Sequence, residues 1–134
     1  MRRHRAFRLA VQVGLVGLLG SAMAAGPLSK QEVMTLLSGA AATQRQTDVT
    51  TYMSGARVEY GADGRVTSSY TGGQSRGFVE HGTWRVTENG QLCITWQGKS
   101  EGPCQYLVPR AGGVYDITAD PARSGKYQII GVSK

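Results

Sequence analysis

Cysteine, histidine and phenylalanine are scarce in this sequence, and their scarcity excludes several kinds of site. The 134 residues contain two cysteines, two histidines and two phenylalanines. Two thiols, Cys93 and Cys104, and one histidine outside the N-terminal segment, His81, do not supply the four ligands of a structural zinc site. The cysteines also lack the Cys-x-x-Cys spacing of redox-active pairs. We therefore expect no metal and no cofactor.

No catalytic residue is expected either. His81 follows Glu80, and a carboxylate close to a histidine can orient a general base. Because adjacent strand residues point to opposite faces, Glu80 is badly placed to orient its neighbour. We interpret His81 as a half-exposed strand residue. The stretch 72–77 is interpreted as a flexible loop, because it lacks the Gly-Lys-Ser/Thr ending of a phosphate-binding loop.

The N-terminal segment has the three parts of a secretion signal. Four arginines and no acidic residue precede an apolar run from Leu9 to Leu19, and Ala22-Met23-Ala24 offers the small side chains that a signal peptidase recognises. We predict a signal peptide over residues 1–24, cleavage before Ala25, and one periplasmic or secreted domain over residues 25–134. The alternative is a membrane anchor or a buried helix, but the apolar run is too short to span a bilayer. Since no cysteine follows the run closely, we expect no lipid anchor and no stable membrane attachment after cleavage.

The charge of the chain changes when this leader is removed. Four of the 15 basic residues are leader arginines, which leaves eleven basic residues against 9 acidic ones and a formal charge of +2. The remaining basic residues are scattered singly, whereas nucleic-acid binding needs a concentrated basic face. We expect no nucleic-acid partner, and the partner is instead an envelope protein or a small ligand.

One helix is predicted near the start of the exported domain. Ser29 and Glu32 have the spacing of a capping box. Four apolar residues then follow at helical spacing, and Gly39 can end the helix. These four residues are Val33, Leu36, Leu37 and Ala40. We expect this apolar stripe to pack on a sheet.

From about Thr43 the apolar residues recur with period two, and the many glycines and threonines favour short strands joined by tight turns. The fold class predicted is mainly β, either a curled antiparallel meander or a small lipocalin-like barrel with one N-terminal helix. Such a barrel fills with side chains or holds one small ligand. The expected strands are Gln44–Tyr52, Ala56–Tyr60, Arg65–Tyr70, Gly82–Thr87, Gln91–Gln97, Cys104–Pro109, Val114–Thr118 and Lys126–Val132. The aromatic residues that could line a cavity, or simply fill the core, are Tyr60, Tyr70, Trp84, Trp96, Tyr106 and Tyr115.

The apolar pattern predicts the register of two hairpins. A three-residue loop, Glu88-Asn89-Gly90, pairs Val86 with Leu92, whereas a two-residue loop would mix polar and apolar side chains on each face. The same reasoning pairs Tyr60 with Val66 in an earlier hairpin.

An even cysteine pair in an exported protein predicts a disulfide, so we expect Cys93 to be joined to Cys104. In the register above, Leu92 and Ile94 share a face and Cys93 lies on the opposite one. The strand that carries Cys104 is partly apolar on both faces. Either the disulfide lies on the outer face of a covered strand, or a bulge intervenes.

A series of short motifs runs from Arg57 to Tyr115. In order, they are an Asp-Gly hairpin at 62–66, a Gly-x-Trp strand at 82–86, Leu-Cys-x-x-Trp at 92–96, and the second cysteine. With the leader and a helix near Leu28 to Leu37, this order resembles a family of small exported bacterial proteins classed only as a domain of unknown function. The resemblance implies an exported location and a β fold, and it implies no activity.

A shorter segment, Ser54-Gly55-Ala56-Arg57, resembles the Ser-Gly-x-x loop of periplasmic inhibitors of c-type lysozyme, which are also small disulfide-bearing β-barrels. The Tyr-Trp-x-Lys-Gly segment of that family does not follow. The resemblance implies a binding loop at Ser54, Gly55 and Arg57, and an inhibitor of a secreted hydrolase such as lysozyme as the alternative function. The favoured function is a non-enzymatic envelope protein that binds a ligand or another protein, and a hydrolase is the least favoured.

Overall fold

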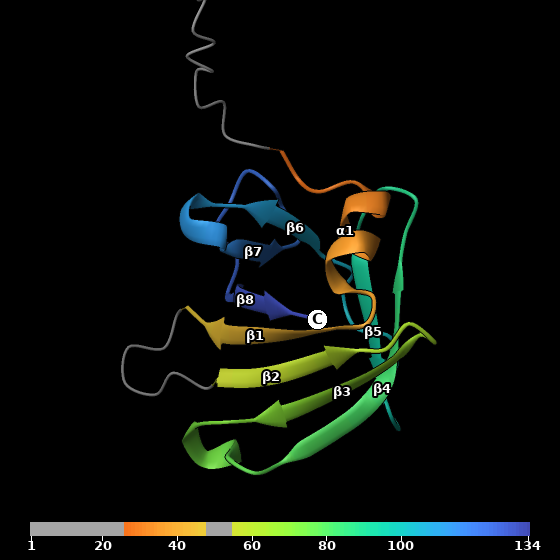
Figure 1. Ribbon diagram of the computed structural model, residues 1–134, viewed down its shortest axis with the longest axis vertical. Helices are drawn as coiled ribbons and strands as arrows, with labels where there is room; N and C mark the ends of the chain where they lie inside the picture. The colour runs from red at the N-terminus through yellow and green to blue at the C-terminus, as the bar shows by residue number, and fades with distance from the viewer. Residues whose placement is uncertain (1–25, 48–54) are drawn as a thin grey trace, which may run out of the picture.

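The computed structural model describes residues 26–47 and 55–134. These ranges contain one α-helix, eight strands and two short 3₁₀ turns (Figure 1). The elements are α1 (Lys30–Leu37), β1 (Ala40–Gln46), β2 (Gly55–Tyr60), β3 (Arg65–Tyr70), η1 (Gly73–Ser75), β4 (Val79–Val86), β5 (Leu92–Trp96), β6 (Tyr106–Pro109), η2 (Ala111–Gly113), β7 (Tyr115–Thr118) and β8 (Tyr127–Ser133).

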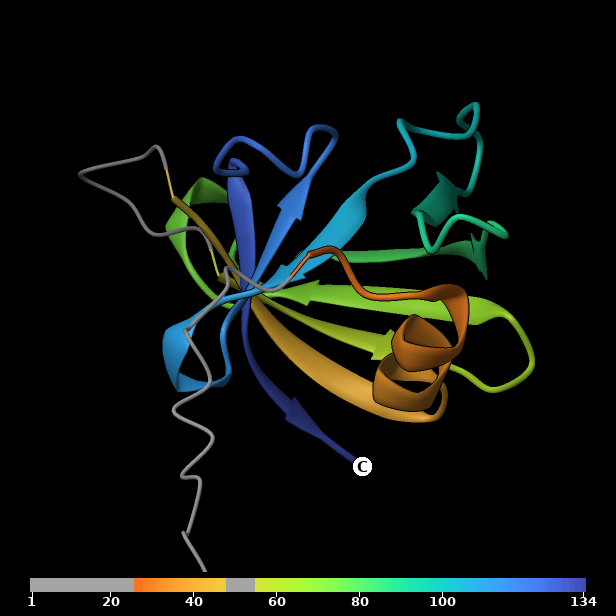
Figure 2. The ribbon, with the colours of Figure 1, turned by 90° about the horizontal axis from the view of Figure 1, so that it is seen from above.

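All eight strands form one antiparallel sheet in the order β5-β4-β3-β2-β1-β8-β7-β6. The sheet curls until its two ends approach each other (Figure 2). There Leu92 of β5 and Gln105, just before β6, form a single bridge pair. The Leu28 N–H donates to the Leu107 carbonyl, so the segment before α1 covers part of the β6 edge. The expected mainly β fold is therefore confirmed, as a curled half-barrel with one helix.

The helix begins as the sequence predicts and ends earlier. The Ser29 and Glu32 side chains each accept a hydrogen bond from the other residue's N–H, at 3.2 and 3.1 Å, which completes the capping box. Gly39 takes the left-handed conformation with φ +74°, and its N–H donates to the Tyr60 carbonyl. The chain therefore turns into β1 at once, and Ala40, expected on the helical stripe, instead pairs with Tyr60 in the sheet.

The first strand was predicted in the wrong place. It runs from Ala40 to Gln46 rather than over Gln44–Tyr52, and residues 48–54 lie outside the described part of the chain. Three consecutive alanines open the strand, and small side chains carry little of the alternation that marks a strand. A register shift between Thr43 and Gln44 further blurs the pattern.

Both predicted hairpin registers are confirmed. Val86 pairs with Leu92, and Tyr60 pairs with Val66. Gly90 has φ +86°, and a side chain on it would overlap the Leu28 carbonyl just before α1. The turn therefore needs glycine both for its backbone conformation and for its close approach to the helix.

The inner face of the curled sheet and one side of α1 enclose the core. Tyr60 and Trp84 meet edge to face with ring centroids 5.4 Å apart, and the Trp84 Nε1–H donates to the Gly61 carbonyl at 2.9 Å. The Gln44 amide donates to the Tyr60 hydroxyl at 2.7 Å. Both rings are thus core residues rather than cavity walls. The other buried core residues are Val33, Leu37, Ala42, Val58, Val66, Val86, Leu92, Leu107, Ile117 and Ile129.

In the described ranges, no helix has the length and apolar character needed to cross a bilayer.

Candidate functional site

Polar side chains collect on the outer face of strands β3, β4 and β5. Thr67 lies opposite His81, and Arg65 lies opposite Thr83, which in turn lies opposite Thr95. Residues directly opposite in neighbouring strands share a face, and these alternate with the buried residues of the inner face. The register of three strands therefore brings hydroxyl, imidazole and guanidinium groups onto one surface.

This surface is hollowed into an open groove of about 680 Å³, which we call the β3–β5 groove. Such a volume is in the range of small-molecule sites. At Gly82 a side chain would overlap the Thr95 carbonyl, so glycine lets β4 and β5 lie close together beneath the groove. The lining residues are Arg65, Val66, Thr67, His81, Gly82, Thr83, Thr95, Trp96, Gln97, Gly98 and Lys99.

His81 is exposed in this groove and contacts a hydroxyl group. Its Nδ1 lies 3.2 Å from the Thr67 Oγ1. Glu80 does not orient it, because the Glu80 carboxylate accepts a hydrogen bond from the Tyr70 hydroxyl at 3.3 Å on the other face of the sheet. The alternation expected for these two neighbours is therefore present. His81 and Thr67 form a hydrogen-bonding pair with the second ring nitrogen of His81 available to a ligand.

The groove carries positive charge at its rim. The Arg65 guanidinium lies 3.7 Å from the Asp63 carboxylate. Lys99 lines the groove, and its ammonium lies 3.7 Å from the Glu80 carboxylate of the other face; both cationic side chains are mostly exposed. Exposed ion pairs at such distances are weak, so these cations can turn to a bound anion. None of the lining residues that the structure describes is acidic.

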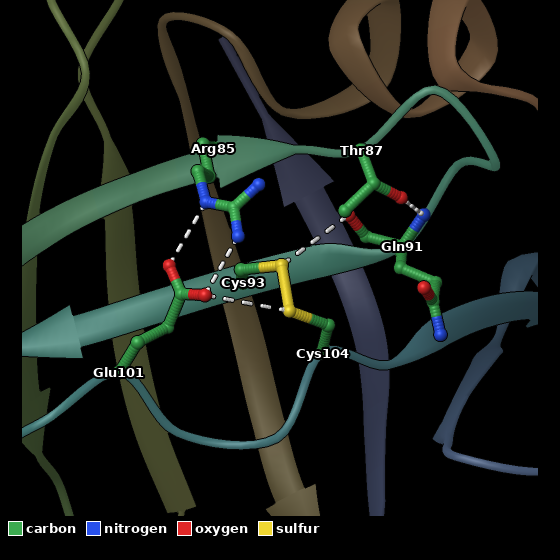
Figure 3. The surroundings of a disulfide bond; sticks show 6 residues. All are labelled: Arg85, Thr87, Gln91, Cys93, Glu101 and Cys104. Atoms are coloured by element: carbon green, nitrogen blue, oxygen red, sulfur yellow. Dashed lines mark hydrogen bonds and ion pairs between the residues drawn. A yellow bond between two sulfur atoms is a disulfide. The ribbon is translucent and has the colours of Figure 1, made fainter.

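The loop that contributes Gln97, Gly98 and Lys99 to the groove is closed by a disulfide, whose surroundings are shown in Figure 3. The predicted bond between Cys93 and Cys104 is present, and it joins β5 to the end of the loop over residues 97–105. Cys93 lies opposite Arg85 on the outer face and is only 1% exposed. The Gly102 N–H donates to the Ile94 carbonyl at 3.0 Å, so the loop folds back along β5. This decides between the two packing alternatives in favour of the outer face of a covered strand.

A bidentate ion pair closes over the disulfide. Arg85 donates from Nε and Nη2 to the two Glu101 carboxylate oxygens at 2.9 and 2.7 Å (Figure 3). These hydrogen bonds lower the pKa of the Glu101 carboxyl and raise the pKa of the Arg85 guanidinium. Glu101 and the two sulfur atoms form the one potential metal cluster of the described residues. Because the sulfurs are bonded to each other, they are not thiolate ligands.

The binding loop implied by the lysozyme-inhibitor resemblance was placed at Ser54, Gly55 and Arg57, and its described residues are not part of this groove. Ser54 lies outside the described residues, whereas Gly55 and Arg57 belong to strand β2 rather than to a loop. The exposed Arg57 guanidinium lies 3.4 Å from Glu59 on the same face of the strand. Neither Gly55 nor Arg57 lines the β3–β5 groove.

One motif escaped the sequence reasoning. Gly73-Gln74-Ser75-Arg76-Gly77 matches the letters Gly-x-Ser-x-Gly of a nucleophile elbow. That motif requires a strand-to-helix turn, but this segment forms the short turn η1 between two antiparallel strands. The hydroxyl that contacts His81 belongs to Thr67 rather than to Ser75. The match therefore lacks the structural context of a nucleophile elbow.

Fold and site together define a small β protein with one disulfide-pinned loop and an open polar groove. The chain belongs to the protein family of unknown function DUF995, which matches residues 7–105. The expected relation to an uncharacterised family is thereby confirmed, and the match includes both cysteines and every groove residue. No curated protein and no solved structure matches the chain significantly.

Proposed function

We propose that this protein is a non-enzymatic, exported binding protein and that the β3–β5 groove takes a small hydroxylated acid. A single observation carries the proposal. The groove of about 680 Å³ is lined by hydroxyl, imidazole, amide and cationic groups, and none of its described lining residues is acidic. Export rests on the leader sequence and on the disulfide, which persists in oxidising compartments.

The groove chemistry favours an anion that also carries hydroxyl groups. Arg65 and Lys99 at the rim would hold a carboxylate, because charge-assisted hydrogen bonds are the stronger ones. The threonine hydroxyls and the Gln97 amide both donate and accept, so they suit the hydroxyl groups of a sugar. A sugar acid such as glucuronate combines the two features and is a suitable first probe.

The proposal is tested by titrating ¹⁵N-labelled protein with glucuronate and, separately, with glucose. We expect glucuronate to bind more tightly and to shift the amide signals of β3, β4 and β5. Thr83→Val removes one groove hydroxyl with little change of shape and should weaken binding about 3- to 10-fold. The matched control is Thr43→Val, since Thr43 is exposed on β1 outside the groove. Equal shifts with both sugars, or none, would contradict the proposal.

Two further outcomes separate the other functional classes. Glutamine in His81→Gln can still hydrogen-bond to a ligand, so glucuronate binding should persist. It cannot act as a general base at neutral pH, so any catalysis that depends on His81 should be lost. Turnover of a ligand that disappears in this variant would favour a hydrolase. Inhibition of lysozyme that is lost in Arg57→Ala and kept in Thr83→Val would favour the inhibitor alternative.

A further inference from the structure

A second group of side chains lies on the inner face, at the end of the sheet farthest from α1. The Tyr70 N–H donates to the Phe78 carbonyl at 3.0 Å, and Ser68 lies opposite Glu80, so β3 and β4 place Tyr70, Phe78 and Glu80 side by side. Tyr127, from β8, lies opposite the buried Ile117, and its phenol is close enough to Tyr70 to interact with it electrostatically. Three aromatic rings and one carboxylate therefore share this end, which we call the aromatic end.

The rings of the aromatic end remain open to solvent. The Phe78 ring lies 6.1 Å from the Tyr70 ring, and Phe78 and Tyr127 are 55% and 44% exposed. Phe78 is the most exposed of the large apolar residues that the structure describes. Such exposure in rings that neighbour one another is typical of a binding surface.

Hydrogen bonds hold the Glu80 carboxylate in a position where it can bind a cation. The Glu80 side chain is 18% exposed and accepts the Tyr70 hydroxyl at 3.3 Å. Burial, followed by the negative charge of Glu80, raises the pKa of the Tyr70 phenol, so Tyr70 stays neutral and continues to donate. Ser68 in turn hydrogen-bonds to Tyr70 and is itself buried. These contacts fix the carboxylate beside the rings.

The chain itself already places an ammonium group near Glu80. The Lys99 Nζ lies 3.7 Å from the Glu80 Oε1, a distance too long for a hydrogen bond, and the lysine side chain is 66% exposed. Because the lysine is mostly exposed and makes no hydrogen bond to Glu80, we treat Lys99 as a replaceable occupant. The contact shows that the surroundings of Glu80 admit an ammonium.

We propose that Tyr70, Phe78, Tyr127 and Glu80 form a binding site for an organic cation, an amine or a quaternary ammonium. Aromatic faces attract such cations through their negative quadrupole, and a neighbouring carboxylate adds Coulombic attraction. The aromatic end and the β3–β5 groove present opposite faces of the sheet and opposite ligand charges. Lys99 lines the groove and pairs with Glu80, so its substitution should affect both sites, whereas substitutions of the other residues test each site separately.

Choline is the probe, and its neutral isostere 3,3-dimethylbutan-1-ol is the control ligand. Isothermal titration of the purified protein should show binding of choline and at least tenfold weaker binding of the isostere. Glu80→Gln should weaken choline binding about tenfold or more, because the charge attraction is lost while the shape is kept. The matched control is Glu59→Gln, since Glu59 is an exposed carboxylate on the outer face of β2.

Further variants distinguish a loss of binding from a loss of folding. Phe78→Ala should weaken choline binding several-fold, whereas Ile130→Ala, at an apolar residue 39% exposed on β8, should leave it unchanged. Lys99→Ala should tighten choline binding and weaken glucuronate binding, because the ammonium competes at one site and assists at the other. Equal affinity for choline and its isostere, or undiminished binding in folded Glu80→Gln, would overturn the proposal.

Discussion

Replacing Cys93 and Cys104 together by alanine should lower the free energy of unfolding by about 3 kcal/mol. The bond closes a loop between residues separated by 11 positions, and the loss of that constraint on the unfolded chain corresponds to about 3 kcal/mol in the chain-entropy treatment. Removing the buried Cys93 sulfur adds roughly 1 kcal/mol at most, since one atom leaves a well-packed position. The unfolding temperature should fall by roughly 10–20 °C.

The fold should survive this double substitution. The Leu92–Gln105 bridge pair and the Gly102 N–H bond to Ile94 hold the loop without the sulfurs. The assay is equilibrium urea denaturation of the oxidised protein, the protein reduced with dithiothreitol, and the alanine variant. The free energies of unfolding of the reduced protein and the variant should agree to within about 1 kcal/mol, since only the variant loses the buried sulfur. A loss below 1 kcal/mol, or a variant that does not fold, would refute the reasoning that the bond acts mainly on the unfolded chain.

Three further predictions concern the turns, the tyrosines and the leader. Gly90→Ala should lower the free energy of unfolding, measured by urea denaturation, by about 2 kcal/mol or more, because Gly90 has a positive φ and the Leu28 carbonyl leaves no space for a side chain. Gly98→Ala, also at positive φ but in open space, should lower it by about 1 kcal/mol. Burial raises the pKa of Tyr60 and of Tyr70, so the native state holds these protons to higher pH than the unfolded chain does. The contribution of these tyrosines to stability should therefore be constant up to about pH 10 and fall above it, and a rise in stability above pH 10 would be inconsistent with buried neutral phenols. Intact-mass measurement of exported protein should give a chain beginning at Ala25, and a mass that includes residues 1–24 would contradict the leader interpretation.

Local chemistry explains which parts of the fold could be predicted from the sequence. The capping box at Ser29 and the hairpin at Gly90 each lie within a few residues, so their spacing specifies their geometry. The start of β1 could not be found in this way, because its alanines suit a helix and a strand almost equally. Gly39 decides between the two by turning the chain at that point.

The candidate sites depend on contacts between strands and were less predictable. The sequence offers Glu80 as the neighbour of His81, whereas its actual partner is Thr67, directly opposite on strand β3, and the apolar pattern did not specify the register of that strand pair. Phe78, just before β4, and Tyr127, in β8, are far apart in sequence, so no local pattern links them. Sequence reasoning located the disulfide correctly but left its face undecided, since the covering loop has no periodic signal.

A crystal structure of the protein with glucuronate tests the β3–β5 groove most directly. We expect the sugar acid to lie over Thr67, Thr83 and His81, with its carboxylate toward Arg65 and Lys99. The loop pinned by the disulfide should keep the position that it has without ligand. An empty groove in crystals soaked at saturating glucuronate, or the sugar bound elsewhere on the molecule, would contradict the assignment of this groove as the binding site.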